Sequence, residues 1–208
     1  MNTFEKLYQQ LKRKYGKPQG QWRLWCQRPK TKKEREEVMM GAILTQRTNW
    51  NNVELSLKNL KEAEIDSFKS IYLLGPKTLE RLIKPSGFYR VKAQYLFNLA
   101  KFIIKTYGTI DKMKKVETKE LREQLLSLKG IGPETADSIL LYALDKPIFV
   151  IDEYTRRLVK KENLAQNLSY QFLQELFEKN IKKDFRFYQD FHALIVIDGK
   201  KDLRKEKV

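Results

Sequence analysis

A glycine-rich turn and a carboxylate lie close together in the segment from Leu128 to Asp152. Gly130 and Gly132 lack a Cβ, so the backbone between them can turn tightly and bring its N–H groups close to a ligand. Pro133 suits the first position of a helix, whose start presents unpaired N–H groups and a positive partial charge. Such a turn can hold a phosphate oxygen, and Asp152 beyond it can stabilise a positive charge or act as a base.

Helices must position both groups, because apolar residues recur at three-to-four spacing on each side of the turn. These residues are Leu121, Leu125 and Leu128 before it and Ala136, Ile139, Leu140, Ala143 and Leu144 after it. The sequence therefore predicts a helix, a tight turn and a second helix. By itself this is weak evidence for phosphate binding, since many helical hairpins use glycine only to reverse the chain.

Most of the remaining chain has the same helical periodicity, and we predict an all-α fold. The segment 147–151 is too short to seed a sheet. No run approaches the roughly 18 to 20 apolar residues of a membrane span, and residues 1–16 lack the apolar core of a signal peptide. We therefore expect an intracellular protein with no membrane partner.

The charge balance agrees with a nucleic-acid partner. Lys and Arg total 42 against 26 Asp and Glu, a formal charge of +16 on 208 residues. A protein that neutralises several phosphates needs such a surplus, although a basic surface that serves only solubility has the same composition. The sign excludes an acidic ligand-buffering protein, and the 41% of hydrophobic residues are enough for a core in one or two domains.

Three longer strings carry a family resemblance. LKGIGPETADSIL (128–140) resembles the helix-hairpin-helix of the endonuclease III superfamily of DNA glycosylases, whose essential aspartate follows the second helix where Asp152 stands in FVIDEYTRRL. AILTQRTNWNNV (42–53) is similar to the family's early helix and DNA-inserting loop, and IKPSGFYRVKAQYLFNLAK (83–101) to its second DNA-contacting turn. The resemblance covers most of residues 38–200 in the family's order.

The resemblance implies two helical lobes with a DNA-binding cleft between them. One would be a six-helix barrel lobe that carries the helix-hairpin-helix, at residues 38–138. The other would combine residues 1–37 with 139–208 and carry the catalytic Asp. Asp152 and the hairpin would then both face the cleft.

Two departures from the best-known members favour one branch of the family. The bifunctional glycosylase/lyases have a nucleophilic lysine two positions after the second hairpin glycine, where this chain has Glu134, and glutamate cannot form a Schiff base. Many relatives bind an iron–sulfur cluster through four cysteines, whereas this sequence has only Cys26. With a tryptophan in LTQRTNW, the chain most resembles the monofunctional 3-methyladenine DNA glycosylases of bacteria and archaea.

Asp152 has two interpretations. Breaking a base–sugar bond builds positive charge on C1′, and a fixed carboxylate stabilises that state while it orients or deprotonates the attacking water. The alternative is that Asp152 only caps the helix EYTRRLVKK, for which aspartate is an excellent residue. Because it follows the apolar FVI just beyond the hairpin helix, we predict that Asp152 is both the cap and the catalytic group.

Tryptophans are the candidates for a base pocket. A base inside duplex DNA must be rotated out of the stack and held between aromatic faces, which attract the positive charge of an alkylated purine. Trp50 matches the position of the family's stacking aromatic, and Trp22, Trp25 and Glu134 complete the predicted pocket. For Trp22 and Trp25, a place in the core is an equally good interpretation.

Other residues are assigned to DNA by the same resemblance. Gln46 matches the family residue that fills the space left by the flipped base, with Arg47 supporting it; alternatively, Gln46 only caps its helix. In the second turn, Ser86 and Gly87 would contact phosphate, with Tyr89 packing or wedging beside them. At the hairpin, phosphate contacts would come from Lys129, Gly130, Gly132 and Thr135.

Metal and cofactor predictions are few. The resemblance implies that a monovalent cation is held at the hairpin by backbone carbonyls, those of Leu126, Leu128 and Ile131. We expect no other cofactor and no iron–sulfur cluster. His192 is the only histidine, which excludes a metal site built on several histidines, and in the apolar stretch FHALIVI we interpret it as structural.

Three functions remain open from sequence. The first is a monofunctional alkylpurine DNA glycosylase of base excision repair, a monomer acting on double-stranded DNA with a damaged base, cytoplasmic and nucleoid-associated. The second is a glycosylase for another lesion, such as an oxidised base or uracil, or one whose lyase activity comes from a different lysine. The third is a non-enzymatic DNA-binding module.

Overall fold

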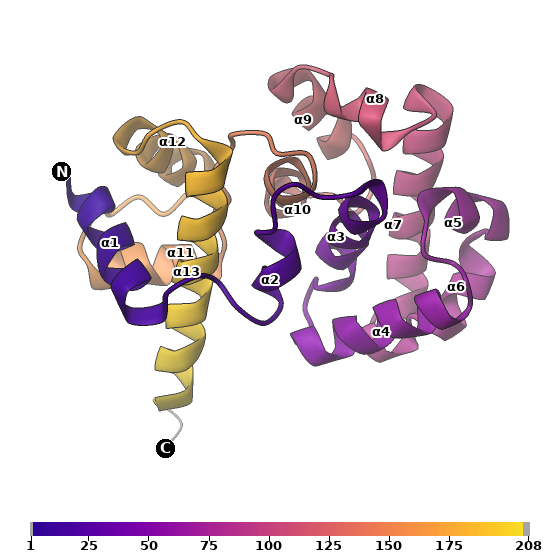
Figure 1. Cartoon of the computed structure of the whole chain (residues 1–208), viewed down its shortest axis with the longest axis horizontal. Helices are drawn as coiled ribbons and strands as arrows, with labels where there is room; N and C mark the ends of the chain where they lie inside the picture. Colours follow the sequence, from indigo (N-terminus) through magenta and orange to yellow (C-terminus); the bar gives the residue numbers. More distant parts are fainter. Residues whose placement is uncertain (1, 206–208) are drawn as a thin grey trace. The chain divides into compact units, whose positions relative to one another are not determined.

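The computed structural model describes residues 2–205, and that part of the chain is all-α (Figure 1). It contains no β-strand within this range, so the predicted fold class is confirmed. None of the helices in the described part is long and apolar enough to cross a membrane.

The helices form two compact units. One is Pro29–Leu144, and the other joins the residues up to Arg28 to those from Asp145 onward. The sequence-based lobe boundaries, residues 38 and 138, both fall inside the first unit. A cleft between the lobes stays a prediction.

The first unit is built around α3 and α7. Its elements are α3 (Lys32–Leu44), α4 (Trp50–Glu62), α5 (Phe68–Leu74), α6 (Pro76–Leu82), the 3-10 turn η1 (Lys84–Ser86), α7 (Tyr89–Phe102), the π-helical segment η2 (Ile103–Tyr107), α8 (Ile110–Lys114), α9 (Thr118–Leu126), α10 (Pro133–Ser138) and the π-helical segment η3 (Ile139–Ala143). Thr31 starts α3 with a capping box completed by Glu34. The predicted helix after the hairpin is present as α10, and from Ile139 onward it continues with π-helical geometry.

The second unit is centred on α13. Its elements are α1 (Thr3–Tyr15), α2 (Trp22–Trp25), α11 (Glu153–Lys161), α12 (Tyr170–Asn180) and α13 (Phe185–Lys205). Both α1 and α11 pack against α13. Aromatic rings fill the core between them, with Phe149 stacked on Phe177 at 4.4 Å between centroids and edge-on to Tyr188.

Side chains of α12 bind the backbone of the irregular segment that leads into Asp152. The main-chain N–H of Phe149 donates to Oε1 of Glu178 at 2.7 Å, and its carbonyl accepts from Nε2 of Gln174 at 2.7 Å. Two side chains thus satisfy the backbone groups that a neighbouring strand would otherwise pair. This explains how segment 147–151 satisfies its backbone groups without a helix or a sheet.

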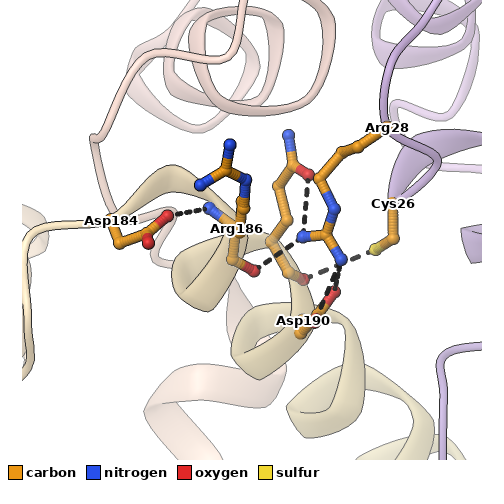
Figure 2. A network of polar contacts seen from close by, with 6 residues as sticks. Cys26, Arg28, Asp184, Arg186 and Asp190 are labelled. Atoms are coloured by element: carbon orange, nitrogen blue, oxygen red, sulfur yellow. Dashed lines mark hydrogen bonds and ion pairs between the residues drawn. The ribbon is translucent and has the colours of Figure 1, made fainter.

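An arginine attaches the segment after α2 to α13 (Figure 2). The Arg28 guanidinium donates to both carboxylate oxygens of Asp190, at 3.0 and 3.2 Å, and to the Arg186 carbonyl at 2.9 Å. The Cys26 thiol points to the Gln189 carbonyl at 3.6 Å. Cys26 is therefore a partly buried side chain that packs within this unit.

The two hairpin glycines have different structural roles. Gly130 has a φ of +95°, and a Cβ there would lie 2.2 Å from Cγ of Tyr95 on α7. Gly132 has a φ of −89°, and a Cβ there would meet nothing within 4 Å. The fold therefore requires glycine only at Gly130, because the Tyr95 ring packs directly against its backbone.

A buried lysine joins the end of α3 to the turn before α7. The Lys92 side chain is 2% exposed, and its Nζ donates to the carbonyls of Leu44 at 2.8 Å and Ser86 at 2.6 Å. Burial lowers the pKa of Lys92 to about 8. The ammonium group satisfies a carbonyl at the C-terminus of α3, where the helix dipole favours a cation.

Gly130→Ala is expected to lower the free energy of unfolding by more than about 1 kcal/mol, because it combines a left-handed φ with a clash against Tyr95. The matched variant Gly132→Ala should change it by less than about 0.5 kcal/mol. Urea denaturation followed by circular dichroism measures both. Equal losses in the two variants would contradict this assignment.

The lowered pKa of Lys92 predicts a pH-dependent stability. Because an unfolded lysine titrates near 10.5, the unfolded chain binds more protons between about pH 8 and 10.5, and this contribution raises stability as pH increases. Relative to Lys92→Met, the wild type should gain up to about 3 kcal/mol across that window. The exposed Lys84→Met, in the same turn, should follow the wild-type curve. Parallel curves for all three proteins would show that Lys92 is not perturbed.

Candidate active site

The hairpin turn between α9 and α10 exposes the groups predicted to contact phosphate. Lys129, Gly132 and Glu134 are exposed, and α10 begins at Pro133 without a side-chain cap. Thr135 is only 9% exposed. The amides at the start of α10 are therefore presented outward, as an anion contact requires.

An ion pair fixes the two hairpin helices against each other. Arg122 on α9 donates from Nε and NH2 to the two carboxylate oxygens of Asp137 on α10, at 2.7 and 3.0 Å. The Asp137 side chain is fully buried. Sequence reasoning missed this pair, although a charged residue within the apolar pattern TADSIL was its signal.

Gln46 docks on the hairpin. Its Nε2 donates to the Gly130 carbonyl at 3.0 Å and to Oγ1 of Thr135 at 3.1 Å. The structure thus brings together three of the predicted DNA-contacting residues, and the Gln46 amide reaches the hairpin instead of capping α3. To enter a duplex, Gln46 would have to exchange these two bonds for contacts with bases.

Two residues at loop tips have left-handed backbone conformations. Arg47, which is exposed, has a φ of 51°, and Phe88, which is 64% exposed, has a φ of 44°. Such conformations cost free energy in residues other than glycine and collect at functional sites. Phe88 was missed in the sequence, where the neighbouring Tyr89 was considered as a wedge. Tyr89 is half-buried at the start of α7, so Phe88 is the exposed ring of this turn.

Ser86 points into the protein. Its side chain is fully buried, and its hydroxyl donates to the Ile83 carbonyl at 2.8 Å. Any phosphate contact in this turn would therefore come from the main chain around Gly87 and not from the serine hydroxyl. Lys92 holds the Ser86 carbonyl and so fixes this turn relative to the end of α3.

The predicted base-pocket residues are divided between the units. Trp50 is half-buried at the start of α4, and its Nε1 donates to Oε1 of Glu54 at 2.8 Å. Trp22 and Trp25 belong to the other unit, where each is 4% exposed and their rings meet edge to face at 5.5 Å. Within that unit these two are core residues, and a role in base binding stays a prediction.

Asp152 caps α11, as predicted. Its Oδ1 accepts from the Thr155 main-chain N–H at 2.8 Å and from the Thr155 hydroxyl at 2.9 Å. Its Oδ2 lies 3.5 Å from Nε2 of His192 on α13. The proximity of His192 was not predicted, because a lone histidine in an apolar helix pattern gave no sign of its neighbour.

The surroundings of Asp152 favour its ionised form. Burial by itself would raise the pKa of Asp152, but the charge and proximity of His192 and the hydrogen bonds from Thr155 outweigh it and lower the pKa. The side chain is 13% exposed. A carboxylate that is fixed, ionised and largely shielded from water can stabilise a developing positive charge.

No group of His, Cys, Asp or Glu side chains within residues 2–205 could hold a metal ion. The predicted cation site consists of main-chain carbonyls instead. The Leu128 carbonyl accepts from the Ile131 N–H at 3.1 Å, which leaves one lone pair for another partner. Cation binding by Leu126, Leu128 and Ile131 stays a prediction.

Comparison with known proteins identifies the family. The family model described as "HhH-GPD superfamily base excision DNA repair protein" matches residues 40–183. A Methanocaldococcus jannaschii protein provisionally named a DNA repair glycosylase is 46% identical over 175 residues, which are 83% of this chain and 80% of the relative.

Solved structures agree. H. pylori 3-methyladenine DNA glycosylase (MagIII), bound to 1,N6-ethenoadenine, has a TM-score of 0.80 and 32% identity over 97% of this chain and 99% of that chain. A trapped endonuclease III–DNA covalent intermediate shares the fold, with a TM-score of 0.74. It is 18% identical in sequence, and the match covers 97% of this chain and 88% of that chain. The chain therefore belongs to the HhH-GPD superfamily of base excision repair DNA glycosylases.

Proposed function

We propose that this DNA glycosylase is monofunctional and hydrolyses the N-glycosidic bond of alkylated purines, such as 3-methyladenine, in double-stranded DNA. Glu134 carries the proposal, because it stands where the lyases of this family have their nucleophilic lysine, and a carboxylate cannot form a Schiff base. The 32% identity with a 3-methyladenine DNA glycosylase over nearly the whole chain supports the substrate class.

In the proposed mechanism the damaged base is first rotated out of the duplex. Gln46 and Phe88, at two neighbouring loop tips, would fill and wedge the space that the base leaves. The flipped base would stack on Trp50, with an attraction of roughly 0.5 to 2 kcal/mol between the ring face and the positive charge of an alkylated purine. That charge also weakens the glycosidic bond, so the site needs little acid catalysis.

Asp152 would then act on the sugar. As the base leaves, positive charge develops on C1′, and the ionised carboxylate stabilises it and orients the water that attacks this carbon. The leaving base takes the bonding electrons, which neutralise its own positive charge. Water supplies the new oxygen, so the product is an abasic site on an intact strand. We expect a monomer that needs no iron–sulfur cluster, since Cys26 is the only cysteine.

Asp152→Asn should slow release of methylated purines from methylated duplex DNA by a factor of about 100 to 1,000, because the ionised group is lost. Asparagine is also a good helix cap, so the fold and the dissociation constant for DNA should be nearly unchanged. The adjacent Glu153→Gln, which removes an exposed charge, is the matched control. Unchanged base release in Asp152→Asn would remove this residue from the mechanism.

Borohydride should trap no covalent complex between the enzyme and methylated DNA, because water and not an amine attacks the sugar. An endonuclease III on its own substrate serves as the positive control for trapping. Denaturing gel electrophoresis detects the adduct. A trapped adduct would support instead a lyase that uses a lysine elsewhere in the chain.

A further inference from the structure

His192 is placed to act on the second oxygen of the Asp152 carboxylate. Thr155 occupies Oδ1 with two hydrogen bonds from within α11, whereas His192 approaches Oδ2 from α13. The two oxygens thus face groups on two different helices, which pack against each other. Capping of α11 needs only the hydrogen bonds from Thr155. Thr31 and Asn49 cap α3 and α4 in the same way, without a histidine beside them.

Aromatic rings define the orientation of the His192 imidazole. The Trp22 ring lies edge to face with it at 5.8 Å and 84°, and the Phe149 ring at 6.2 Å and 85°. The His192 side chain is only 4% exposed. These walls restrict rotation of the imidazole and keep its Nε2 edge toward Asp152. Because Gln174 and Glu178 bind the Phe149 backbone, the Phe149 ring is itself held in place by α12.

The charged groups around this pair are few. On α11, Tyr154 has its pKa raised by burial and by the negative charge of Asp152, while Arg157 on the same helix lowers it. From α13 the group that acts on Asp152 is His192, and α2 and segment 147–151 present the rings of Trp22 and Phe149. His192 and Thr155 are therefore the groups that offset the burial of the Asp152 carboxylate.

We propose that His192 is a positioning residue for base excision, which fixes the orientation of Oδ2 of Asp152 while the base leaves. This inference rests on the catalytic role of Asp152 in the proposed function. His192 itself neither touches the substrate nor transfers a proton to it. Without His192, Oδ1 of Asp152 would still accept hydrogen bonds from Thr155, but Oδ2 would lose its neighbour on α13.

Two substitutions at this position separate the N–H donor from the ionisable ring. His192→Phe removes both, and His192→Gln keeps an N–H donor near the position of Nε2 without an ionisable group. Tyr188→Phe is the packing control, because Tyr188 is buried on the same helix and its hydroxyl has no hydrogen-bond partner. The assay is single-turnover release of methylated purines from methylated duplex DNA between about pH 5 and 8, with spontaneous release subtracted.

His192→Phe should lower the rate at neutral pH about tenfold or more while the dissociation constant for DNA changes less than about twofold. Its rate should also fall toward the acid end of this range while that of the wild type stays flat, because the pKa of wild-type Asp152 lies below its ordinary value and rises when His192 is lost. His192→Gln should recover most of the rate of base release at neutral pH, but its rate should still fall toward the acid end of the range. Tyr188→Phe should match the wild type in both.

The outcomes distinguish this inference from the function on which it rests. If the wild type releases no methylated purine, the proposed function fails. If the wild type is active and His192→Phe has the same rate and the same dependence on pH, the inference is wrong and the proposed function stands. If His192→Phe folds poorly, the test is how the rate of His192→Gln depends on pH at the acid end of the range. A dependence identical to that of the wild type overturns the inference.

Discussion

The ionised state of one nearly buried carboxylate is the constraint on which the rest of the site depends. Removing Asp152 from water favours its protonated form, and only interactions with neighbouring side chains can reverse that preference. Thr155 on α11 and His192 on α13 supply them. The position of the carboxylate therefore depends on how α11, α13 and the anchored Phe149 pack within one unit.

In the turns that are predicted to contact DNA, buried groups fix the position of exposed backbone. Tyr95 packs against Gly130, the Arg122–Asp137 pair clamps α9 to α10, and Lys92 ties the end of α3 to the turn that ends at Gly87. The tips themselves carry strained, exposed residues. Preorganised main chain of this kind suits a ligand such as phosphate, which carries no sequence information.

The sequence was sufficient for features set by local pattern. The all-α fold, the helix-hairpin-helix and the cap at Asp152 follow from periodicity, glycine and capping chemistry between neighbours in the chain. Features set by distant residues could not be read in this way. His192 approaches Asp152 from another helix, and Lys92 donates hydrogen bonds to two carbonyls, one of them at the end of α3.

The most direct test of hydrolysis by water is the product of the wild-type enzyme on a methylated duplex. Abasic sites are counted as strand breaks on denaturing gels, with and without alkali after the reaction. We expect strands to break only after alkali, because in the proposed mechanism Asp152 activates water and Glu134 cannot attack the sugar. Strand breaks of equal number without alkali would contradict it.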